Sequence, residues 1–415
     1  MTIARLFVAL ILVAVFVAPA AAEETPTFSK DVAPILYEHC VACHRAGEFA
    51  PMPLVTYDEA RPWARAIRQR VEAREMPPWY AEPGHQEYSN DASLSDEAIA
   101  MIGAWVEGGA PEGNPAHLPD VPAFPEGWTI GEPDIVLSML APYDVPADGT
   151  VPYLYFTVPT NFTEDKWVKA VEIKPGDRRV VHHVIATLQQ SDPAAPPSPE
   201  PTLRRDRQRQ SGSLGGTTPN KLGNVYPEGV ARKIPAGAEI VLQMHYTTIG
   251  EATSDQTSVG LIFQDEPPTR AVGGGQVINA RFVIPPGAAD HQVRAEQVIE
   301  EDTWLTTMNP HMHSRGKDFT YTAVYPDGTE EILLRVPNYN FDWQLTYRLA
   351  EPKLLPAGTR LVGVAHYDNS VNNRHNPDPS AEVRWGDQTW EEMMIGFYGT
   401  EDLSGATEPT TTSGG

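Results

Sequence analysis

The stretch Cys40-Val41-Ala42-Cys43-His44 uses both cysteines of this 415-residue chain and places a histidine directly after the second one. Two thiols at this spacing can add to the two vinyl groups of a haem, and His44 can then bind the iron as its proximal ligand. The alternative is a structural disulfide, but a C-x-x-C pair does not need the histidine. We therefore expect a covalent haem c here.

Helical patterns surround this motif between residues 23 and 117. The expected segments are a helix over 33–37 capped by Ser29, a second helix over 58–74, and a third that begins at Ser95 and stops at Gly108-Gly109. Three short helices around C-x-x-C-H are typical of a small all-α cytochrome c domain. Residues 57–79 and 101–113 also resemble the cytochrome c domains fused to bacterial oxidases and oxygenases.

A haem needs either a sixth ligand or an open position, and the candidates in this segment are Met52, Met76 and His85. We favour Met76, because it follows the second helix and because Pro77-Pro78 would stiffen the loop that holds its thioether against the iron. Core packing is the alternative for any single methionine.

Composition limits the partners of the chain. Its 31 basic and 55 acidic residues give a formal net charge of -24, which repels nucleic acid and anionic lipid. A hydrophobic content of 41% is ordinary for a globular protein, and the length suggests two to four domains.

Residues 1–22 have the features of a secretory signal. Arg5 precedes an apolar run over 6–17, and Ala20-Ala21-Ala22 offers a cleavage site. We expect cleavage near Ala22, a periplasmic or secreted protein and no stable membrane insertion afterwards. An uncleaved anchor is the alternative. Because the haem motif uses both cysteines, no disulfide can stabilise the remaining chain.

The pattern changes after a Pro-rich linker over 118–133. Short β-branched and aromatic runs alternate with turns; for example, the alternation over 319–323 and the Pro326-Asp327-Gly328 turn predict a hairpin. We expect two all-β domains, antiparallel jelly-roll-like sandwiches over 134–268 and 269–402, followed by a disordered tail over 403–415. Residues 190–225 are expected to form a mobile surface insertion.

An internal similarity supports two related halves. Ile234-Pro235-Ala236-Gly237 leads into a run that ends at His245-Tyr246, and Leu355-Pro356-Ala357-Gly358 leads into a run that ends at His366-Tyr367. This pattern predicts a duplicated domain, although one such match can arise by chance.

Several histidines have the spacing of metal ligands. His182 and His183 are adjacent in a strand-like run, so a bulge must bend the backbone if both are to bind one ion, with His245 as a third ligand. His311 and His313 would share one face of a strand. Met393 or Met394 could add a thioether there.

The ligand types favour copper. Imidazoles suit several metals, but an added thioether favours copper that cycles through Cu(I). Zinc hydrolases usually add a carboxylate, as in His-Glu-x-x-His, and that motif is absent from the sequence. The alternative is that these are hydrogen-bonded histidines of the β region.

The order His-His, Met-His-Tyr, His-x-His and Glu-Met resembles the copper type II, ascorbate-dependent monooxygenases, the family of the peptidylglycine hydroxylating and dopamine beta-monooxygenases. The similarity covers residues 135–400. It implies two copper ions, an electron-storing site and an oxygen-binding site that hydroxylates a C–H bond across a solvent-filled gap. The ligands that it implies are His182, His183 and His245 for the first site, and His311, His313 and Met393 for the second.

The sequence also departs from that family. Asn309, Ile395 and Phe397 occupy the positions at which the peptide-processing relatives anchor a substrate carboxylate, so peptidylglycine is not the expected substrate. The disulfides of the animal members cannot form here. We expect His366 to be structural, and His85, His117, His291 and His375 to be loop residues.

Together, these features predict a haem-fused copper monooxygenase that uses O2 to hydroxylate a small organic substrate. An external electron donor would reduce the cytochrome c domain, which would pass electrons to the coppers in place of ascorbate. Two alternatives remain at this point: a non-catalytic haem and copper electron-transfer protein, and a zinc hydrolase or isomerase.

Overall fold

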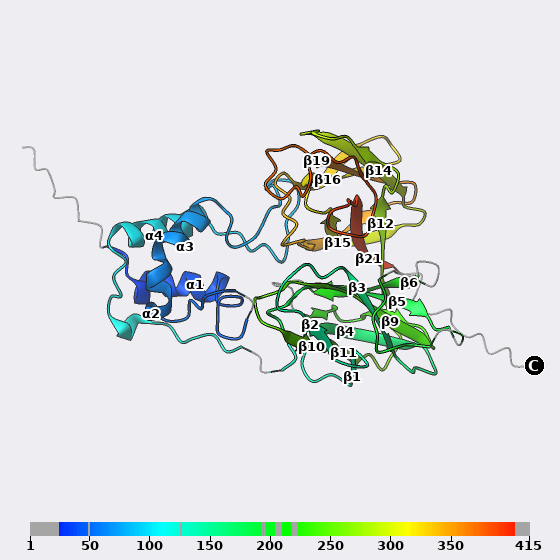
Figure 1. Cartoon of the computed structure of the whole chain (residues 1–415), viewed down its shortest axis with the longest axis horizontal. Helices are drawn as coiled ribbons and strands as arrows, with labels where there is room; N and C mark the ends of the chain where they lie inside the picture. The colour runs from blue at the N-terminus through cyan, green and yellow to red at the C-terminus, as the bar shows by residue number, and fades with distance from the viewer. Residues whose placement is uncertain are drawn as a thin grey trace, which may run out of the picture.

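The structure is a computed structural model of the whole chain. It describes residues 25–48, 50–124, 127–192, 194, 196–203, 210–217 and 223–402. The expected signal peptide over 1–22 and the expected tail over 403–415 lie outside these residues. Strands are the commonest regular structure of the described chain, and the helices gather in its N-terminal part (Figure 1).

The helical segments lie between Phe28 and His117. They are η1 (Phe28–Val32), α1 (Ala33–His39), α2 (Tyr57–Ala60), η2 (Arg61–Trp63), α3 (Ala64–Glu72), α4 (Asp96–Glu107) and η3 (Pro115–His117). They share one hydrophobic cluster, in which Leu36, Ile102 and Trp105 are fully buried. We call this part the helical unit.

Local signals explain most of the helix boundaries. Ser95 accepts a hydrogen bond from the Ala98 amide and caps α4, as predicted. The helix predicted over 58–74 is present but changes to a 3-10 turn around Pro62, which has no amide hydrogen to donate. Ser29 was predicted to be a cap and is not one. It is buried within the wide turn η1, and Val32 precedes α1 without a side-chain cap.

The strands begin at Ile135. In chain order they are β1 (Ile135–Ser138), β2 (Tyr143–Val145), β3 (Leu154–Pro159), β4 (Lys166–Lys174), β5 (Val181–Gln190), β6 (Gln210–Thr217), β7 (Asn224–Val225), β8 (Val230–Ile234), β9 (Ala238–Tyr246), β10 (Thr253–Asp255), β11 (Ser258–Phe263), β12 (Arg270–Ile278), β13 (Val283–Ile284), β14 (His291–Val298), β15 (Thr303–His311), β16 (Gly316–Val324), β17 (Glu330–Val336), β18 (Tyr347–Leu355), β19 (Arg360–Tyr367), β20 (Val383–Arg384) and β21 (Ile395–Asp402).

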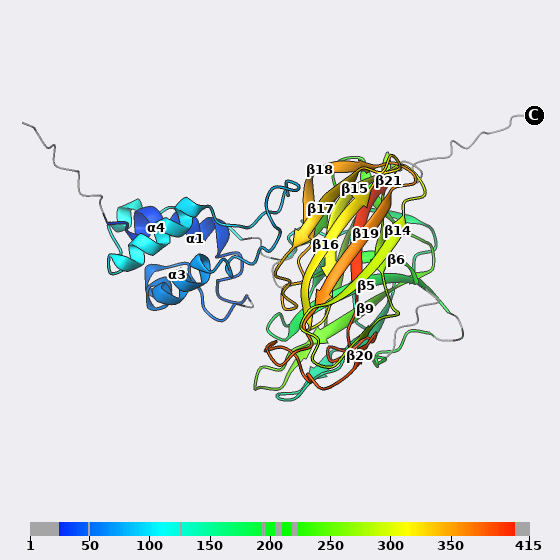
Figure 2. The same ribbon diagram turned by 90° about the horizontal axis from the view of Figure 1, so that it is seen from above.

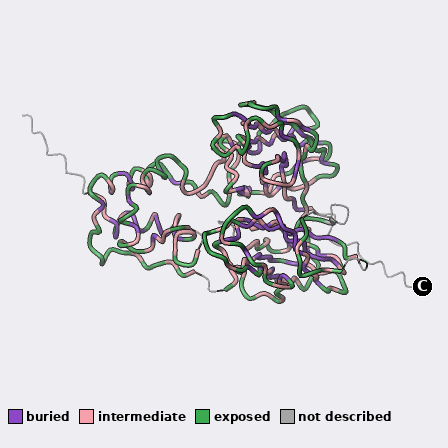
Figure 3. Tube along the Cα trace, viewed as in Figure 1, coloured by how far each residue is buried: buried purple, intermediate pink, exposed green. Residues whose placement is uncertain are grey.

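These strands surround two hydrophobic clusters. One contains buried residues from Met139 to Leu261, and the other contains buried residues from Val277 to Met394. Figure 3 shows buried residues running through the inside of both regions. We call these regions the first and second β units.

One sheet runs through both β units. Its order is β1-β11-β4-β8-β12-β21-β15-β18, and the parallel pair β8–β12 joins the two parts. A four-stranded sheet, β3-β9-β5-β6, contributes to the first cluster, and another, β14-β19-β16-β17, contributes to the second. The hairpin predicted around 326–328 is the β16–β17 pair.

Residues 190–225 are not wholly an insertion, because β6 pairs with β5 and β7 pairs with β4; residues 204–209 and 218–222 lie outside the described part. Among the described residues, no helix is both long and apolar enough to cross a membrane.

Candidate metal centre

Adjacent strands β5 and β9 bring three histidines together. The register between these strands shifts between Val181 and His183, and His183 lies opposite His245. This irregularity is the bulge that the sequence predicts as a condition for both neighbours to face one ion. His182, His183 and His245 each offer a ring nitrogen, and these atoms lie within 4.8 Å of one another.

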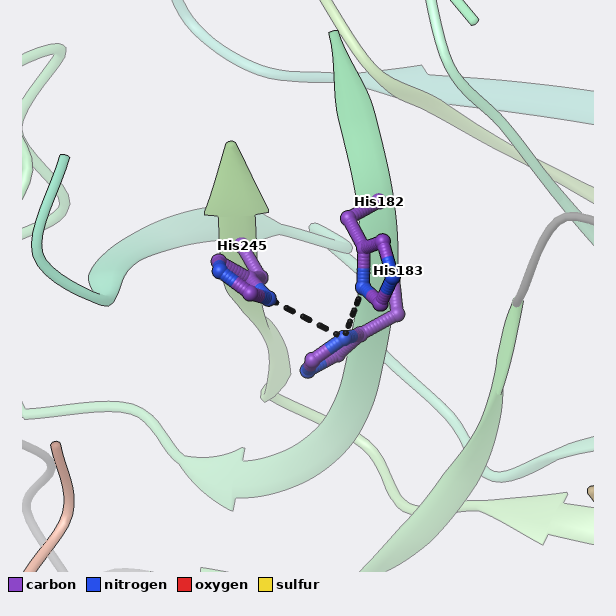
Figure 4. A group of neighbouring side chains, drawn as sticks. All are labelled: His182, His183 and His245. Carbon is purple, nitrogen blue, oxygen red and sulfur yellow. Dashed lines mark hydrogen bonds between the residues drawn. The ribbon is translucent and has the colours of Figure 1, made fainter. Parts of the chain in front are cut away.

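The Nδ1 atoms of these three imidazoles converge. His183 Nδ1 lies 3.1 Å from His182 Nδ1 and 3.4 Å from His245 Nδ1 (Figure 4). A neutral imidazole carries a proton on only one of its two nitrogens, so hydrogen bonds alone cannot pair three Nδ1 atoms that face one another. A metal ion can accept a lone pair from all three. We call these residues the three-histidine site; three imidazole nitrogens fit a transition-metal ion such as copper or zinc.

Burial keeps these imidazoles neutral. It lowers the pKa of His182, lowers the pKa of His245 to about 3, and lowers the pKa of His183 well below its ordinary value, and in His183 and His245 repulsion from neighbouring histidines adds to this effect. A neutral imidazole is the form that binds a metal. The site therefore presents its lone pairs at pH 7 without first losing protons.

The second pair of histidines presents a different nitrogen. His311 is the last residue of β15, and His313 lies just beyond it, with 5.4 Å between the ring centroids. His311 Nδ1 lies 2.7 Å from Gln344 Oε1, and His313 Nδ1 lies 3.2 Å from the Glu391 carbonyl oxygen. Since these oxygens can only accept, Nδ1 carries the proton and Nε2 keeps its lone pair in both rings.

The Nε2 atom of His313 is buried and has no hydrogen-bond partner among the described residues. Burial lowers the pKa of His311 to about 4 and, with repulsion from His311, that of His313 to about 3. A buried, unpaired lone pair costs free energy unless something binds it. These features fit a metal bound through Nε2, and we call this pair together with Met393 the His-x-His site.

Glu392 connects the two segments of the His-x-His site. Its carboxylate accepts hydrogen bonds from the amides of His313 at 2.8 Å, Arg315 at 2.7 Å and Met393 at 3.3 Å. Burial nevertheless raises the pKa of Glu392 to about 8. Met394 is fully buried in the core of the second β unit, so Met393 is the better placed of the two candidate thioethers.

Two aromatic residues lie between the two sites. Tyr153 has its ring centroid 4.9 Å from that of His245 and 6.4 Å from that of His313. The Phe341 centroid lies 6.3 Å from His182 and 5.9 Å from His313. Aromatic side chains therefore stand where the family resemblance predicts a solvent-filled gap.

The haem motif has the donors that its attachment needs. Cys40 and Cys43 are both free, and burial raises their thiol pKa values to about 12 and about 11. His44 Nδ1 lies 3.0 Å from the Met52 carbonyl oxygen, which fixes this nitrogen as the donor and leaves Nε2 for an iron. The donor set therefore fits a covalent haem.

The other candidate ligands have different surroundings. Met76 is half-buried and follows α3, whereas His85 Nε2 is paired with Glu82 at 3.0 Å. His366 Nδ1 is paired with Asp318 at 2.6 Å. His291 was predicted in a loop but begins β14.

Sequence patterns did not identify Tyr153, Phe341, Gln344 or Glu392 as parts of the site. Glu392 carried a signal, because it directly precedes Met393. The other three come from distant positions and approach the histidines only through strand pairing and loop packing.

No family model and no curated protein matches the chain. Among solved structures, the chain is similar to the STIV MCP, with a TM-score of 0.27 and 6% identity over 66% of this chain and 95% of that one. It is also similar to allantoicase, with a TM-score of 0.17 and 10% identity over 55% of this chain and 81% of that one. Similarities this distant carry no inference about function.

Proposed function

We propose that this protein is a periplasmic or secreted copper-dependent monooxygenase with a built-in cytochrome c domain. In this proposal the helical unit is the cytochrome c domain, and the two β units are its copper-binding domains. The observation that carries the proposal is the pair of neighbouring histidine sites, which hold five imidazoles whose pKa values are lowered by burial. The signal-like residues 1–22 and the haem motif support export, because c-type haem is attached outside the cytoplasm.

The two histidine sites would have different roles. His182, His183 and His245 would hold one copper ion as an electron store, and His311, His313 and Met393 would hold the other. Each copper ion would supply one of the two electrons that the reaction needs, so that one oxygen atom of O2 enters a C–H bond of a small organic substrate and the other leaves as water with two protons. The imidazole and thioether donors support copper over zinc, because a thioether favours Cu(I).

The chain's own residues would prepare these sites. Gln344 orients His311, the Glu391 carbonyl orients His313, and Glu392 holds the His313 and Met393 backbones together. Such contacts hold the ligands in position. Their loss commonly lowers metal affinity by roughly 10-fold to 100-fold.

Electrons would enter through the haem held by Cys40, Cys43 and His44, with Met76 as the proposed sixth ligand. An external donor, such as a small redox protein, would reduce this haem. The motif lies close to the first β unit, since Glu48 forms an ion pair of 3.3 Å with Arg178, a few residues before His182. This proximity supports transfer within one chain, and in this proposal the haem would take the place of free ascorbate.

The test begins with the metal content of the purified protein and the reoxidation of its reduced haem by air. We expect one haem and two coppers per chain, and reoxidation that is fast with copper and slow without it. The His311→Ala variant separates a monooxygenase from a simple electron carrier, because an electron carrier would show unchanged oxygen uptake. Protein that holds haem but shows no copper-dependent reoxidation would refute the proposal.

A further inference from the structure

The loop between β17 and β18 approaches the helical unit and both histidine sites. We call its residues 339–344 the bridging loop. Figure 2 shows β17 and β18 on the side of the β region that faces the helical unit. The loop is held to its own unit by Tyr339, whose hydroxyl donates to the Met312 carbonyl oxygen at 2.8 Å and accepts from the Met312 amide at 3.1 Å. Met312 is the residue between the two histidines of the His-x-His site.

The bridging loop contacts the three-histidine site through two neighbouring residues. The Phe341 ring stacks on His182, with an interplanar angle of 23°, and its centroid also lies 6.2 Å from that of His245. His182 donates a hydrogen bond to the backbone of Asp342. Both contacts restrict the imidazole of His182, which is the bulged residue and has no opposite partner on β9.

The same loop contacts the His-x-His site. Gln344 Oε1 accepts the Nδ1 proton of His311, and Phe341 packs against His313. One loop of six residues thus contacts His182, His245, His311 and His313. A shift of this loop would therefore change both sites together.

The helical unit reaches this loop through the segment between α3 and α4. We call residues 79–90 the strap. Its Tyr80 side chain hydrogen-bonds the Asn340 side chain in the bridging loop. Trp79 packs edge-on against Tyr347, the first residue of β18, with 5.0 Å between ring centroids. Pro77 and Pro78 alone separate the strap from Met76.

Other strap contacts avoid the bridging loop. The Tyr88 hydroxyl donates to the Leu333 carbonyl oxygen at 3.0 Å, and the Asn90 amide donates to the Thr346 carbonyl oxygen at 2.7 Å. These bonds dock the strap on β17 and on the residue that precedes β18. They provide a matched control, because a tyrosine hydroxyl can be removed at position 80 or at position 88.

We propose that the bridging loop is a positioning element that the docked strap holds, and that Phe341 and Gln344 position the ligands of both histidine sites. Its role in electron transfer rests on the proposed function, in which a ferrous haem held by the helical unit would give one electron to a cupric ion at the histidine sites, and no atom would be transferred. The packed residues Tyr80, Asn340 and Phe341 would form the contact between the two units along this route.

The first experiment uses the holoprotein without added copper and measures amide hydrogen exchange of residues 339–344. Tyr80→Phe removes one hydrogen bond to the loop, worth about 1 kcal/mol, so we expect exchange to rise roughly threefold to tenfold. Tyr88→Phe should leave exchange in this loop within about twofold of the wild type, since its bond goes elsewhere. Equal exchange in the wild type and Tyr80→Phe would overturn the proposal.

The second experiment uses copper-loaded protein and the cupric electron paramagnetic resonance spectrum. Phe341→Leu should change the spectrum of the three-histidine site and slow anaerobic oxidation of ferrous haem by roughly tenfold, while the circular dichroism spectrum is retained. An unchanged spectrum with an unchanged rate would overturn the role of Phe341. A wild-type protein whose haem is not oxidised by copper would instead refute the proposed function, and the exchange experiment would still decide the role of the loop.

Discussion

The two β units contain matching strand pairs with different chemistry. In the first unit, β5 and β9 have a register shift between Val181 and His183, and His183 faces His245. In the second unit, β16 and β19 have a register shift between Gly316 and Asp318, and Asp318 faces His366. The two bulges lie at equivalent places, but one displays imidazoles and the other displays an ion pair.

A buried acid next to each bulge extends the match. Asp255 accepts hydrogen bonds from the Gly176 and Asp177 amides, as Glu392 does from the His313 and Arg315 amides. Similar strand ends therefore do not specify a metal site. The residue opposite the last histidine of the strand decides whether a metal can bind, because the carboxylate of Asp318 pairs with His366 whereas the imidazole of His183 and that of His245 keep lone pairs for an ion.

The largest expected difference is in copper binding between a variant at His245 and a variant at His366. The His245→Ala variant should lose copper from the three-histidine site, with affinity lowered by at least roughly 100-fold. The His366→Ala variant should keep both coppers, because its imidazole is paired with Asp318. Copper per chain after dialysis against a weak chelator measures both, and loss of copper from His366→Ala alone would invert the comparison.

The next effect concerns the stability of the copper-free protein at low pH. His245, His311 and His313 have lowered pKa values in the folded state, so the unfolded chain binds more protons below pH 6.5 and stability falls on acidification. Each of these three histidines should lower the free energy of unfolding by up to about 2 kcal/mol between pH 7 and pH 5. The raised pKa of Glu392 has the opposite effect: acidification should raise the free energy of unfolding through this group by about as much as one histidine lowers it.

Urea unfolding at both pH values measures this dependence. The His245→Gln variant should lose less stability on acidification than the wild type does. If the wild type were equally stable at pH 5 and pH 7, the imidazoles would not be buried and neutral in the folded protein.

A smaller difference in copper affinity is expected between variants at the two buried acids, Glu392 and Asp255. Glu392→Gln replaces one of the two carboxylate oxygens that accept from three amides by an NH2 group that cannot accept, and it should lower copper affinity at the His-x-His site by roughly 10-fold to 100-fold. Asp255→Asn should destabilise the first unit and leave the His-x-His site near its wild-type affinity, as distant sites are usually independent. Copper titration of both variants checks this, and equal affinity in the wild type and Glu392→Gln would contradict it.

The smallest effect is expected at the ion pair of the second bulge. His366 and Asp318 are partly exposed, so His366→Asn should change the free energy of unfolding by less than about 1 kcal/mol. Chemical denaturation at neutral pH is the measurement. A loss of several kcal/mol would show that this pair has a structural importance that the comparison does not assign to it.

Much of the framework could be predicted from local patterns. Ser95 marks the start of α4 because its hydroxyl satisfies a free amide of the first turn. Strand geometry alone left two possibilities for His182 and His183, a bulge or a single ligand, since neighbours on a regular strand face opposite sides, and the register shift shows the bulge. Ser29 failed as a predicted cap because tertiary packing buried it in η1.

The sequence by itself determined the candidate ligands, the C-x-x-C-H spacing and the condition that His182 and His183 need a bulge if both are to bind one ion, because these depend on residue types and on spacing within a few residues. Only the tertiary structure decided that His245 joins a cluster while His366 pairs with Asp318. It also placed Tyr153 and Phe341 between the sites and brought Tyr80 to Asn340. These contacts join residues far apart in the chain, and strand register and loop packing, which no local pattern encodes, set them.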